Sequence, residues 1–343
     1  MTTCAIVSFR LGLTDGVSIV AATWADALRS FGFDVVTVAG EGPVDRTIPG
    51  LAIGASADDE LTPAVAEALG DAAVVVVENL CTIPLNLPAA RAVARALAGR
   101  PAILHHHDPP WQRDRFAHVT ELPADDPAWR HVTINHLTER QFADRGLTAT
   151  TIYNGFDVHA PPGDRLGTRA RLGVDPDEIL VAHPVRAIAR KGIGSALALC
   201  EELEATYWLL GEAEEGYGDE LDGLLTAAGC RVVRHPLPHG PDIYAAPDLV
   251  VFPSTWEGFG NPPIEASLAG RPVAVGPYPV GAELRGLGFE WFDVGDTDRI
   301  RAWLAEPDPT VIEHNRRVAE EQFSLEVMTG RLRGLLDEAG WLP

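Results

Sequence analysis

The sequence predicts an α/β protein with two Rossmann-like domains, each a doubly wound parallel sheet, facing each other across a cleft. Short apolar, β-branched runs alternate with Ala/Leu-rich stretches of helical periodicity almost from end to end, which is typical of parallel α/β folds. A polar interval with prolines and glycines at residues 159–178 interrupts this alternation, and we interpret it as a linker. A length of 343 residues suits two domains of ordinary size.

The expected domain limits follow from that interruption. We expect an amino-terminal domain of residues 1–165 and a carboxyl-terminal domain of residues 176–322. Residues 323–343 carry apolar side chains at helical spacing, so we expect a final helix that packs back across the domains. Ligands of doubly wound sheets bind at the carboxyl ends of the strands, which places the expected site in the crevice between the domains.

Each half supplies its own strands and helices. The first half has apolar runs that look like strands buried on both faces, at residues 4–9, 34–40, 72–80, 101–107, 131–135 and 149–155. Helical periodicity lies between them, at residues 17–32, 61–70, 87–99 and 137–146. In the second half the strand candidates are residues 179–185, 206–211, 230–236, 248–254, 271–277 and 290–295, again separated by helices.

The charge balance excludes several classes of partner. The net charge is −22, with 46% hydrophobic and 22% charged residues. Nucleic acids and anionic membranes recruit basic surfaces, so we expect neither a nucleic-acid partner nor membrane association. An anionic small ligand could still occupy a local basic pocket inside the acidic shell. The amino terminus lacks the basic start and long apolar run of a signal peptide, and we expect a cytoplasmic protein.

Cysteine and histidine spacing gives little support for a metal site. The four cysteines are scattered without C-x-x-C spacing and are expected to be reduced core thiols. Strand alternation puts His105 and His107 on one face and His106 on the other. Since the sequence shows no second cluster of ligands, we expect no metal.

The stretch "PSTWEGFGNPPIEASLAG", residues 253–270, combines groups suited to a polar ligand. A buried strand ends, a glycine-containing loop follows, and a proline opens a helix whose free N–H groups suit ligand oxygens. Glu257 lies in the loop and Glu265 near the first turn, and two carboxylates around a glycine loop could bind the hydroxyls of a sugar. A solvated surface charge is the alternative for either glutamate, and for Glu265 a helix-dipole contact.

Several segments together resemble one enzyme family. "EGFGNPPIEA" resembles the E-x7-E signature of retaining glycosyltransferases of the GT-B fold, family 4, and "VRAIARKG" resembles the R-x4-K-G element of that family. "TIYNGFD", "PAILHHHD", "FGFDVVTVAG" and "FSLEVMTGRL" are similar to further segments of the family. These pieces occur in the family's order and span nearly the whole chain.

The resemblance implies a role for each matching residue. The carboxyl-terminal domain would bind a nucleotide diphosphate sugar as donor, and the amino-terminal domain would bind the acceptor. The implied catalytic residues are Glu257, His107, Arg186 and Lys191, and the implied donor-binding residues are Gly16, Arg186, Lys191, Gly258, Phe259, Gly260, Asn261 and Glu265. In this scheme Glu257 and His107 bind the donor sugar, Glu265 holds the ribose, and no cofactor or metal is required.

Lys191 is the only lysine of the chain, and arginine fills the other 26 basic positions. Chance alone could leave one lysine. Lysine, however, is a compact charge on a flexible stem, whereas arginine is a planar fork, so together Arg186 and Lys191 could address two phosphates. Cations fixed near a departing diphosphate stabilise the transition state more than the ground state.

The amino-terminal loop departs from the family pattern. In "RLGLTDGVS" Gly12 and Gly16 are separated, where the family often has a Gly–Gly pair, and a plain turn is the alternative interpretation. The loop still precedes a helix, so Gly16 could face a phosphate. Asp15 and Trp111 are candidates for the acceptor side, and Asn261 stands where leucine is commoner.

These features predict a metal-independent hexosyltransferase of carbohydrate biosynthesis. It would transfer a hexose such as glucose or mannose, with retention, to a hydroxyl of a soluble small-molecule or saccharide acceptor. A nucleotide-sugar epimerase, a sugar phosphorylase or a catalytically silent nucleotide-sugar-binding partner would use the same fold. A Rossmann oxidoreductase is disfavoured because the first strand–helix turn lacks G-x-G-x-x-G.

Overall fold

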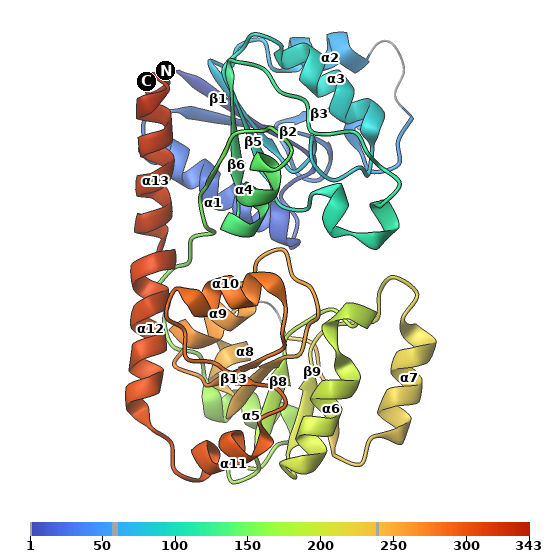
Figure 1. Ribbon diagram of the computed structural model, residues 1–343, viewed down its shortest axis with the longest axis vertical. Coiled ribbons are helices and arrows are strands. Elements are labelled where there is room, and N and C mark those ends of the chain that lie inside the picture. Colours follow the sequence, from blue (N-terminus) through green and yellow to red (C-terminus); the bar gives the residue numbers. More distant parts are fainter. Residues whose placement is uncertain (1, 57–60, 238–239) are drawn as a thin grey trace. The chain divides into compact units, whose positions relative to one another are not determined.

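A computed structural model describes residues 2–56, 61–237 and 240–343 (Figure 1). The chain divides into two compact units. Unit 1 comprises Met1–Gly155 and Leu325–Pro343, and unit 2 comprises Phe156–Ser324. Each unit is built around one parallel sheet, which confirms the predicted fold class.

Unit 1 holds a seven-stranded parallel sheet in the order β3-β2-β1-β4-β5-β6-β7. Every strand expected in this half is present, and the two-residue edge strand β3 is additional. The strands are β1 (Thr3–Arg10), β2 (Asp34–Glu41), β3 (Arg46–Thr47), β4 (Val74–Glu78), β5 (Ala102–His106), β6 (Trp129–Thr133) and β7 (Ala149–Thr151). All five residues of β4 and of β5 are buried, as the uninterrupted apolar runs predict.

Three helices of unit 1, α1, α3 and α4, begin where a side chain accepts hydrogen bonds from their free N–H groups. Asp15 caps α1 by accepting from the backbone N–H groups of Val17 and Ser18, and Asn86 and Asn135 cap α3 and α4 in the same way. The helices are α1 (Gly16–Ser30), α2 (Leu61–Ala68), α3 (Leu87–Leu97) and α4 (His136–Ala143). The short 3₁₀ turns are Pro49–Leu51, Pro110–Gln112 and Asp114–Phe116.

Unit 2 holds a six-stranded parallel sheet in the order β10-β9-β8-β11-β12-β13. Its strands are β8 (Leu180–His183), β9 (Thr206–Leu209), β10 (Val232–Arg234), β11 (Leu249–Phe252), β12 (Val273–Val275) and β13 (Phe292–Asp293). Its helices are α5 (Arg165–Leu172), α6 (Ile193–Glu202), α7 (Gly218–Ala227), α8 (Asp242–Ala245), α9 (Asn261–Leu268), α10 (Pro279–Gly286), α11 (Thr297–Ala305) and α12 (Pro309–Phe323), with a 3₁₀ turn at Ala189–Lys191.

The interval 159–178 is not a simple linker, because it contains helix α5. Asp164 caps this helix, and Gly173 ends it in the left-handed conformation with φ +66°. The Arg169 side chain is 2% exposed and donates to the Ala246 carbonyl oxygen at 3.0 Å and to Asp248 Oδ2 at 3.2 Å. Arginine contacts and the buried Leu172 together attach α5 to the rest of unit 2, and the units change at residues 155 and 156.

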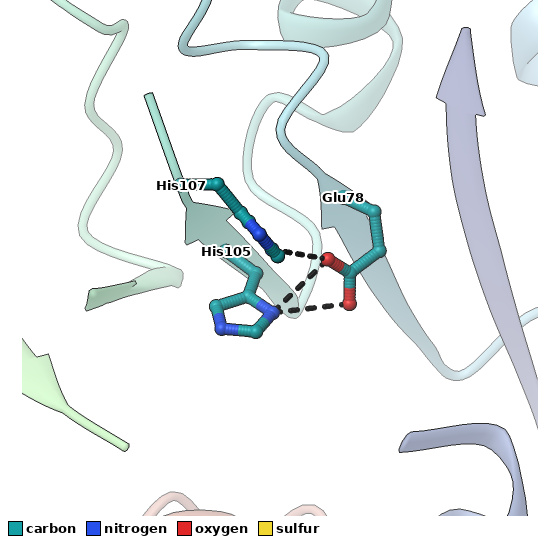
Figure 2. A group of neighbouring side chains, drawn as sticks. All are labelled: Glu78, His105 and His107. Carbon is teal, nitrogen blue, oxygen red and sulfur yellow. Dashed lines mark hydrogen bonds and ion pairs between the residues drawn. The ribbon is translucent and has the colours of Figure 1, made fainter. Parts of the chain in front are cut away.

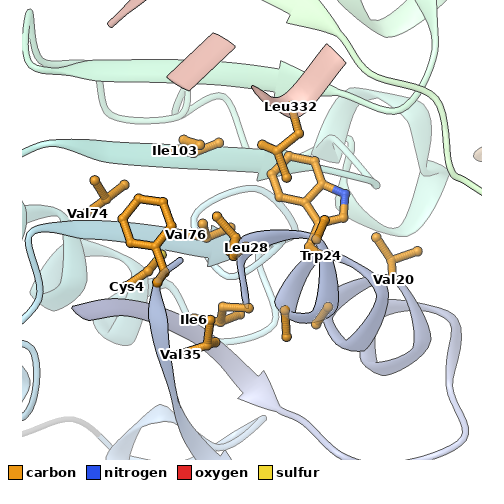
Figure 3. Packing of buried hydrophobic residues seen from close by; sticks show 14 of the residues in the cluster. Cys4, Ile6, Val20, Trp24, Leu28, Val35, Val74, Val76, Ile103 and Leu332 are labelled. Carbon is orange, nitrogen blue, oxygen red and sulfur yellow. The ribbon is translucent and has the colours of Figure 1, made fainter. Parts of the chain in front are cut away.

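The final helix α13 (Leu325–Glu338) belongs to unit 1, although it follows the whole of unit 2 in the chain. It contributes Met328, Leu332, Leu335 and Leu336 to the hydrophobic core formed by β1, β4 and α1. Figure 3 shows Leu332 in this cluster together with Trp24 and Leu28. The last segment of the chain thus completes the core of unit 1, although the whole of unit 2 lies between this segment and the first part of unit 1 in the sequence.

None of the helices in the three described ranges is both long enough and apolar enough to cross a membrane.

Shortening Leu332 to alanine should destabilise unit 1 by about 2–5 kcal/mol, because the side chain is 0% exposed and leaves a cavity. Urea denaturation monitored by tryptophan fluorescence would measure the change, since Trp24 lies in the same cluster. Leu325→Ala on the same helix is the matched control, because Leu325 is 37% exposed and should cost far less. Equal losses in the two variants would contradict the packing of α13.

Candidate functional site

The strand order of unit 2 creates a switch point between β8 and β11. These strands are neighbours, with Leu249 opposite Val181, while β9 lies on the far side of β8 and β12 on the far side of β11. Connections leaving such neighbours diverge, so the space at their carboxyl ends is open to a ligand. The two loops at this edge are residues 184–192 and 253–260, which carry the two signature segments.

Glycine allows these two loops to approach closely. Gly192 has φ +68°, and a Cβ atom there would lie 2.5 Å from the Pro253 carbonyl oxygen. The Thr255 N–H donates to the Arg190 carbonyl oxygen at 3.0 Å, which joins the loops through the backbone. The glycine after Lys191 is therefore required by the packing of one loop against the other.

A compact ionic cluster occupies this edge. Lys191 Nζ lies 2.5 Å from Glu257 Oε1, and Arg190 Nη1 lies 3.1 Å from Glu257 Oε2. Arg190 Nη1 also donates to the Trp256 carbonyl oxygen at 2.7 Å. The side chains of Lys191 and Glu257 are each only 11% exposed. Two cations thus share one carboxylate in a largely buried setting.

Burial and neighbouring charges shift the pKa values in this cluster. Burial lowers the pKa of Lys191, and the charges of Arg190 and Arg186 lower it further, although Glu257 opposes them. Burial opposes ionisation of Glu257, but the charges of Lys191 and Arg190 outweigh it and lower the pKa of that carboxyl. Burial, with the Lys191 charge, lowers the pKa of His183 to about 3, so this neighbour is neutral. Because Lys191 and Arg190 pair with the single carboxylate of Glu257, the cluster contains one more cation than anion, which suits an anionic ligand.

Arg186 is oriented differently from the arginine next to Lys191. Its Nη1 donates to Glu214 Oε2 at 2.7 Å, and the two side chains are 56% and 47% exposed. The structure therefore brings Lys191 and Glu257 together, with Arg190 as the contacting arginine. Arg186 lies in an exposed ion pair, from which its charge still acts on Lys191.

The helix that follows Glu257 presents its amino terminus at the same edge. Helix α9 begins at Asn261 after Gly260, which has φ +125° and no side chain to cap the helix. The positive end of the helix dipole suits a ligand oxygen or phosphate. Gly258 and Phe259 lie in the loop between Glu257 and this helix. Glu265 lies within α9, where its Oε2 accepts a hydrogen bond from Tyr244 Oη.

Unit 1 has a second polar cluster, at the carboxyl ends of β4 and β5. The register places Glu78 opposite His105, and strand alternation brings His107 to the same side. Figure 2 shows both imidazole rings turned toward the Glu78 carboxylate. His105 Nδ1 and His107 Nε2 each lie 3.0 Å from Glu78 Oε2, and all three residues are buried.

The three side chains of this cluster could also hold a metal ion. One ligand atom from each of Glu78, His105 and His107 lies within 4.8 Å of the others. Two imidazole nitrogens and a carboxylate oxygen are ligands that zinc accepts. We expected no metal site because the sequence shows no second cluster of ligands, and that reasoning overlooked Glu78. The prediction that His105 and His107 lie on one face of the strand is confirmed.

His106 lies on the opposite face in a separate hydrogen-bonded chain. Its Nδ1 lies 2.5 Å from Thr82 Oγ1, and its Nε2 lies 2.8 Å from His131 Nδ1. His131 Nε2 in turn lies 3.1 Å from Asp125 Oδ1. Burial lowers the pKa of His106 well below its ordinary value. This histidine therefore has a satisfied interior role, apart from the Glu78 cluster.

Local contacts account for the side chains considered for the acceptor side. Asp15 caps α1, and its Oδ2 accepts from Ser18 Oγ at 2.9 Å. Gly16, which we expected to bind the donor, is the first residue of α1, and that role stays a prediction. Trp111 Nε1 donates to Gln141 Oε1 at 2.8 Å, and the Arg145 guanidinium carbon lies 4.1 Å from the centroid of the Trp111 ring. A role in acceptor binding for Asp15 or Trp111 stays a prediction.

Sequence reasoning considered residues 78–84 only as a possible acceptor loop and gave no individual role to Glu78, Asn79, Arg190 or Tyr244. Glu78 and Asn79 follow four consecutive valines, so a polar pair at the end of a buried strand was the available signal. Asn79 has φ +57°, and its Oδ1 accepts from the N–H groups of His107 and Asp108 at 3.1 and 3.2 Å. Arg190 and Tyr244 gave no comparable signal, because their contacts cross between elements.

The chain is similar to known glycosyltransferases. It is 25% identical to the mannosylglucosylglycerate synthase of Thermotoga maritima over 94% of this chain and 96% of that protein. A D-inositol 3-phosphate glycosyltransferase of Rhodococcus jostii is 36% identical over 39% of this chain and 34% of its own length. No family model matches the chain.

Solved structures agree on the fold. HepE of Anabaena, in complex with UDP-glucose, superposes with a TM-score of 0.78 at 20% identity over 98% of this chain and all of that chain. Sucrose-phosphate synthase of Thermosynechococcus elongatus gives a TM-score of 0.74 at 16% identity, covering 98% of this chain and 99% of that chain. The predicted GT-B fold is thereby confirmed.

Replacing Gly260 with alanine should strain the loop before α9. The φ of +125° disfavours any side chain, and the new Cβ atom would lie 2.6 Å from Tyr278 Oη. We expect a loss of about 1–3 kcal/mol in the free energy of unfolding, measured by chemical denaturation. Gly286→Ala is the control, because a Cβ atom at that position would meet nothing within 4 Å and lies in helix α10, where alanine is favourable. If both variants were as stable as the parent, the conformation of this loop would be wrong.

Proposed function

We propose that the chain is a retaining glycosyltransferase that moves a hexose from a nucleotide diphosphate sugar to a hydroxyl of a small soluble acceptor. The observation that carries this proposal is the cluster of Lys191, Arg190 and Glu257 at the switch point of unit 2. It combines an excess of cations with a carboxylate, next to a helix amino terminus. A sugar linked to a diphosphate needs both kinds of group.

The cations of this cluster would bind the diphosphate. Lys191 and Arg190 are held by one shared carboxylate, so they keep charge available for a second anion. Arg186 could turn from its exposed pair with Glu214, since exposed ion pairs are weak. As the bond to the donor sugar breaks, negative charge grows on the leaving phosphate, and fixed cations stabilise it.

Glu257 would bind hydroxyls of the donor sugar, with Gly258 to Asn261 supplying backbone N–H groups. An ionised carboxylate is a strong acceptor, and the lowered pKa of Glu257 keeps it ionised at neutral pH. Glu265 would bind the ribose, exchanging or sharing its hydrogen bond from Tyr244. In unit 1, His107 would contact the donor sugar.

The reaction would need no separate general base. A nonbridging oxygen of the leaving diphosphate can accept the proton of the attacking acceptor hydroxyl while that hydroxyl forms the new glycosidic bond. Attack on the face that the diphosphate leaves would retain the anomeric configuration. The chain's residues then act by binding, orienting and neutralising charge.

The names of the related proteins are consistent with these substrates. HepE of Anabaena binds UDP-glucose, and the Thermotoga relative is named for a mannosylated product. Glycerate and inositol 3-phosphate, which occur in the names of the relatives, are small hydroxylated molecules. We therefore propose UDP- or another nucleotide-linked glucose or mannose as donor, and a small polyol or saccharide as acceptor.

Lys191→Ala should lower kcat by roughly 10²–10³-fold, the usual effect of removing one electrostatic contact to a developing charge. The variant should stay folded, because Arg190 still pairs with Glu257. Nucleotide release from UDP-glucose and GDP-mannose, with a panel of polyol acceptors, would measure turnover. Near-normal kcat in this variant would refute the assignment.

Arg234→Ala is the matched control for that experiment. Arg234 lies in the same unit and pairs with Glu212, whose side chain is 76% exposed, so removal of the Arg234 side chain should leave turnover unchanged.

Incubation of the parent protein with donor alone distinguishes a transferase from an epimerase, because an epimerase makes a new nucleotide sugar without an acceptor.

Turnover should persist after exhaustive treatment with EDTA, since the proposed charge stabilisation comes from Lys191 and Arg190 rather than a metal ion. Activity would be compared before and after chelation, with Mg²⁺, Mn²⁺ and Zn²⁺ added back separately. Loss of activity that one of these ions restores would contradict metal independence.

A further inference from the structure

The Glu78 cluster in unit 1 is built as a support for His107. Neighbouring strands β4 and β5 run parallel, with Glu78 opposite His105, and His107 follows two residues later on the same side. The carboxylate thus contacts both rings (Figure 2). Its Oε2 is 3.0 Å from His107 Nε2 and 3.0 Å from His105 Nδ1, while its Oε1 is 3.1 Å from His105 Nδ1.

The carboxylate is the group that all contacts share, and it is ionised. Glu78 is 0% exposed. Burial opposes ionisation, while the hydrogen bonds from His105 and His107 favour the ionised form and lower the pKa of Glu78. Burial lowers the pKa of His105, so its ring is neutral at pH 7 and donates through Nδ1.

An ionised carboxylate can only accept hydrogen bonds, so it selects the protonated nitrogen of the ring that faces it. His107 Nε2 must then carry the proton in the contact with Glu78. In the neutral ring, Nδ1 keeps its lone pair and can accept a hydrogen bond from a ligand hydroxyl. The carboxylate therefore determines both the orientation of the ring and its tautomer.

The backbone around His107 is held independently of this contact. Asn79 Oδ1 accepts from the N–H groups of His107 and Asp108, and His105 stacks on Trp24 with ring centroids 4.1 Å apart. A change at Glu78 that keeps its volume should leave the main chain in place and act on the His107 ring.

We propose that Glu78 is a positioning residue, which holds His107 as the Nε2-protonated tautomer and presents its Nδ1 to a hydroxyl of the donor sugar. This rests on the proposed function for the role of His107 toward the sugar. The tautomer itself is a property of the ligand-free protein. Glu78 does not touch the substrate in this scheme and acts only through His107.

The tautomer is measured directly by ¹⁵N NMR of the full chain labelled at histidine, without substrate. Two-bond ¹H–¹⁵N correlations distinguish a protonated Nε2 from a bare one, and His107→Ala assigns the signals of His107. We expect a protonated Nε2 in the parent protein. In Glu78→Gln we expect a shifted tautomer population, because an amide can either donate or accept. A bare Nε2 in the parent, or an unchanged His107 signal in Glu78→Gln, would overturn the proposal.

Kinetics test whether Glu78 acts through His107. We expect Glu78→Gln to lower kcat/KM by about 10–100-fold, the range known for carboxylates that orient a metal-bound histidine. The same substitution in a His107→Ala background should have no further effect, because residues acting as a unit are not additive. Equal losses in both backgrounds would overturn the positioning role. If His107→Ala itself were fully active, the role of His107 in the proposed function would fail, while the NMR result would still stand alone.

His106→Asn separates positioning from general destabilisation. His106 lies on the same strand and is equally buried, but it contacts Thr82 and His131 instead of Glu78. This variant should lose thermal stability and keep the kcat/KM of the parent at a temperature where it is folded. A loss of kcat/KM as large as that of Glu78→Gln would show that any buried change in β5 disturbs the site, and would contradict the proposal.

Discussion

The Glu257 carboxylate shared by Lys191 and Arg190 is the interaction on which the donor site depends. Burying three charged groups is unfavourable unless they pair closely, and here two cations are within 3.1 Å of one carboxylate. Removing Glu257 would leave both cations without their shared partner, whereas removing one cation leaves the carboxylate paired with the other. The same arrangement leaves a positive excess beside the amino terminus of α9, so an anionic ligand completes the cluster.

Both units place a buried carboxylate where polar side chains from another segment converge. In unit 2, Glu257 follows β11 and pairs with the loop after β8, which brings the two signature segments into one cluster. In unit 1, Glu78 ends β4 and pairs with histidines at the end of β5. In each case parallel pairing of two strands determines which side chains meet, because the carboxyl ends of neighbouring strands lie at one edge.

The sequence was sufficient for the elements whose signal is local. Uninterrupted β-branched runs located the strands, and alternation correctly separated His106 from His105 and His107. Helix α5 was missed because Leu172 is its only apolar side chain in the core cluster of described residues, and arginine side chains supply other contacts, to carbonyl oxygens about 80 residues away. Glu78 was missed for a related reason, since its partners depend on the register between β4 and β5. Motif spacing pointed to Arg186, but only the loop conformation shows that Arg190 contacts Glu257.

The central claim is that unit 2 binds a diphosphate through its cationic cluster, and calorimetry tests it most directly. UDP, UMP and uridine, followed by the guanosine series, would be titrated into the full chain under identical conditions. The account predicts saturable binding of at least one nucleoside diphosphate, much tighter than its monophosphate and weakened by salt. Absence of heat with every diphosphate, or equal affinity for a diphosphate and its monophosphate, would contradict it.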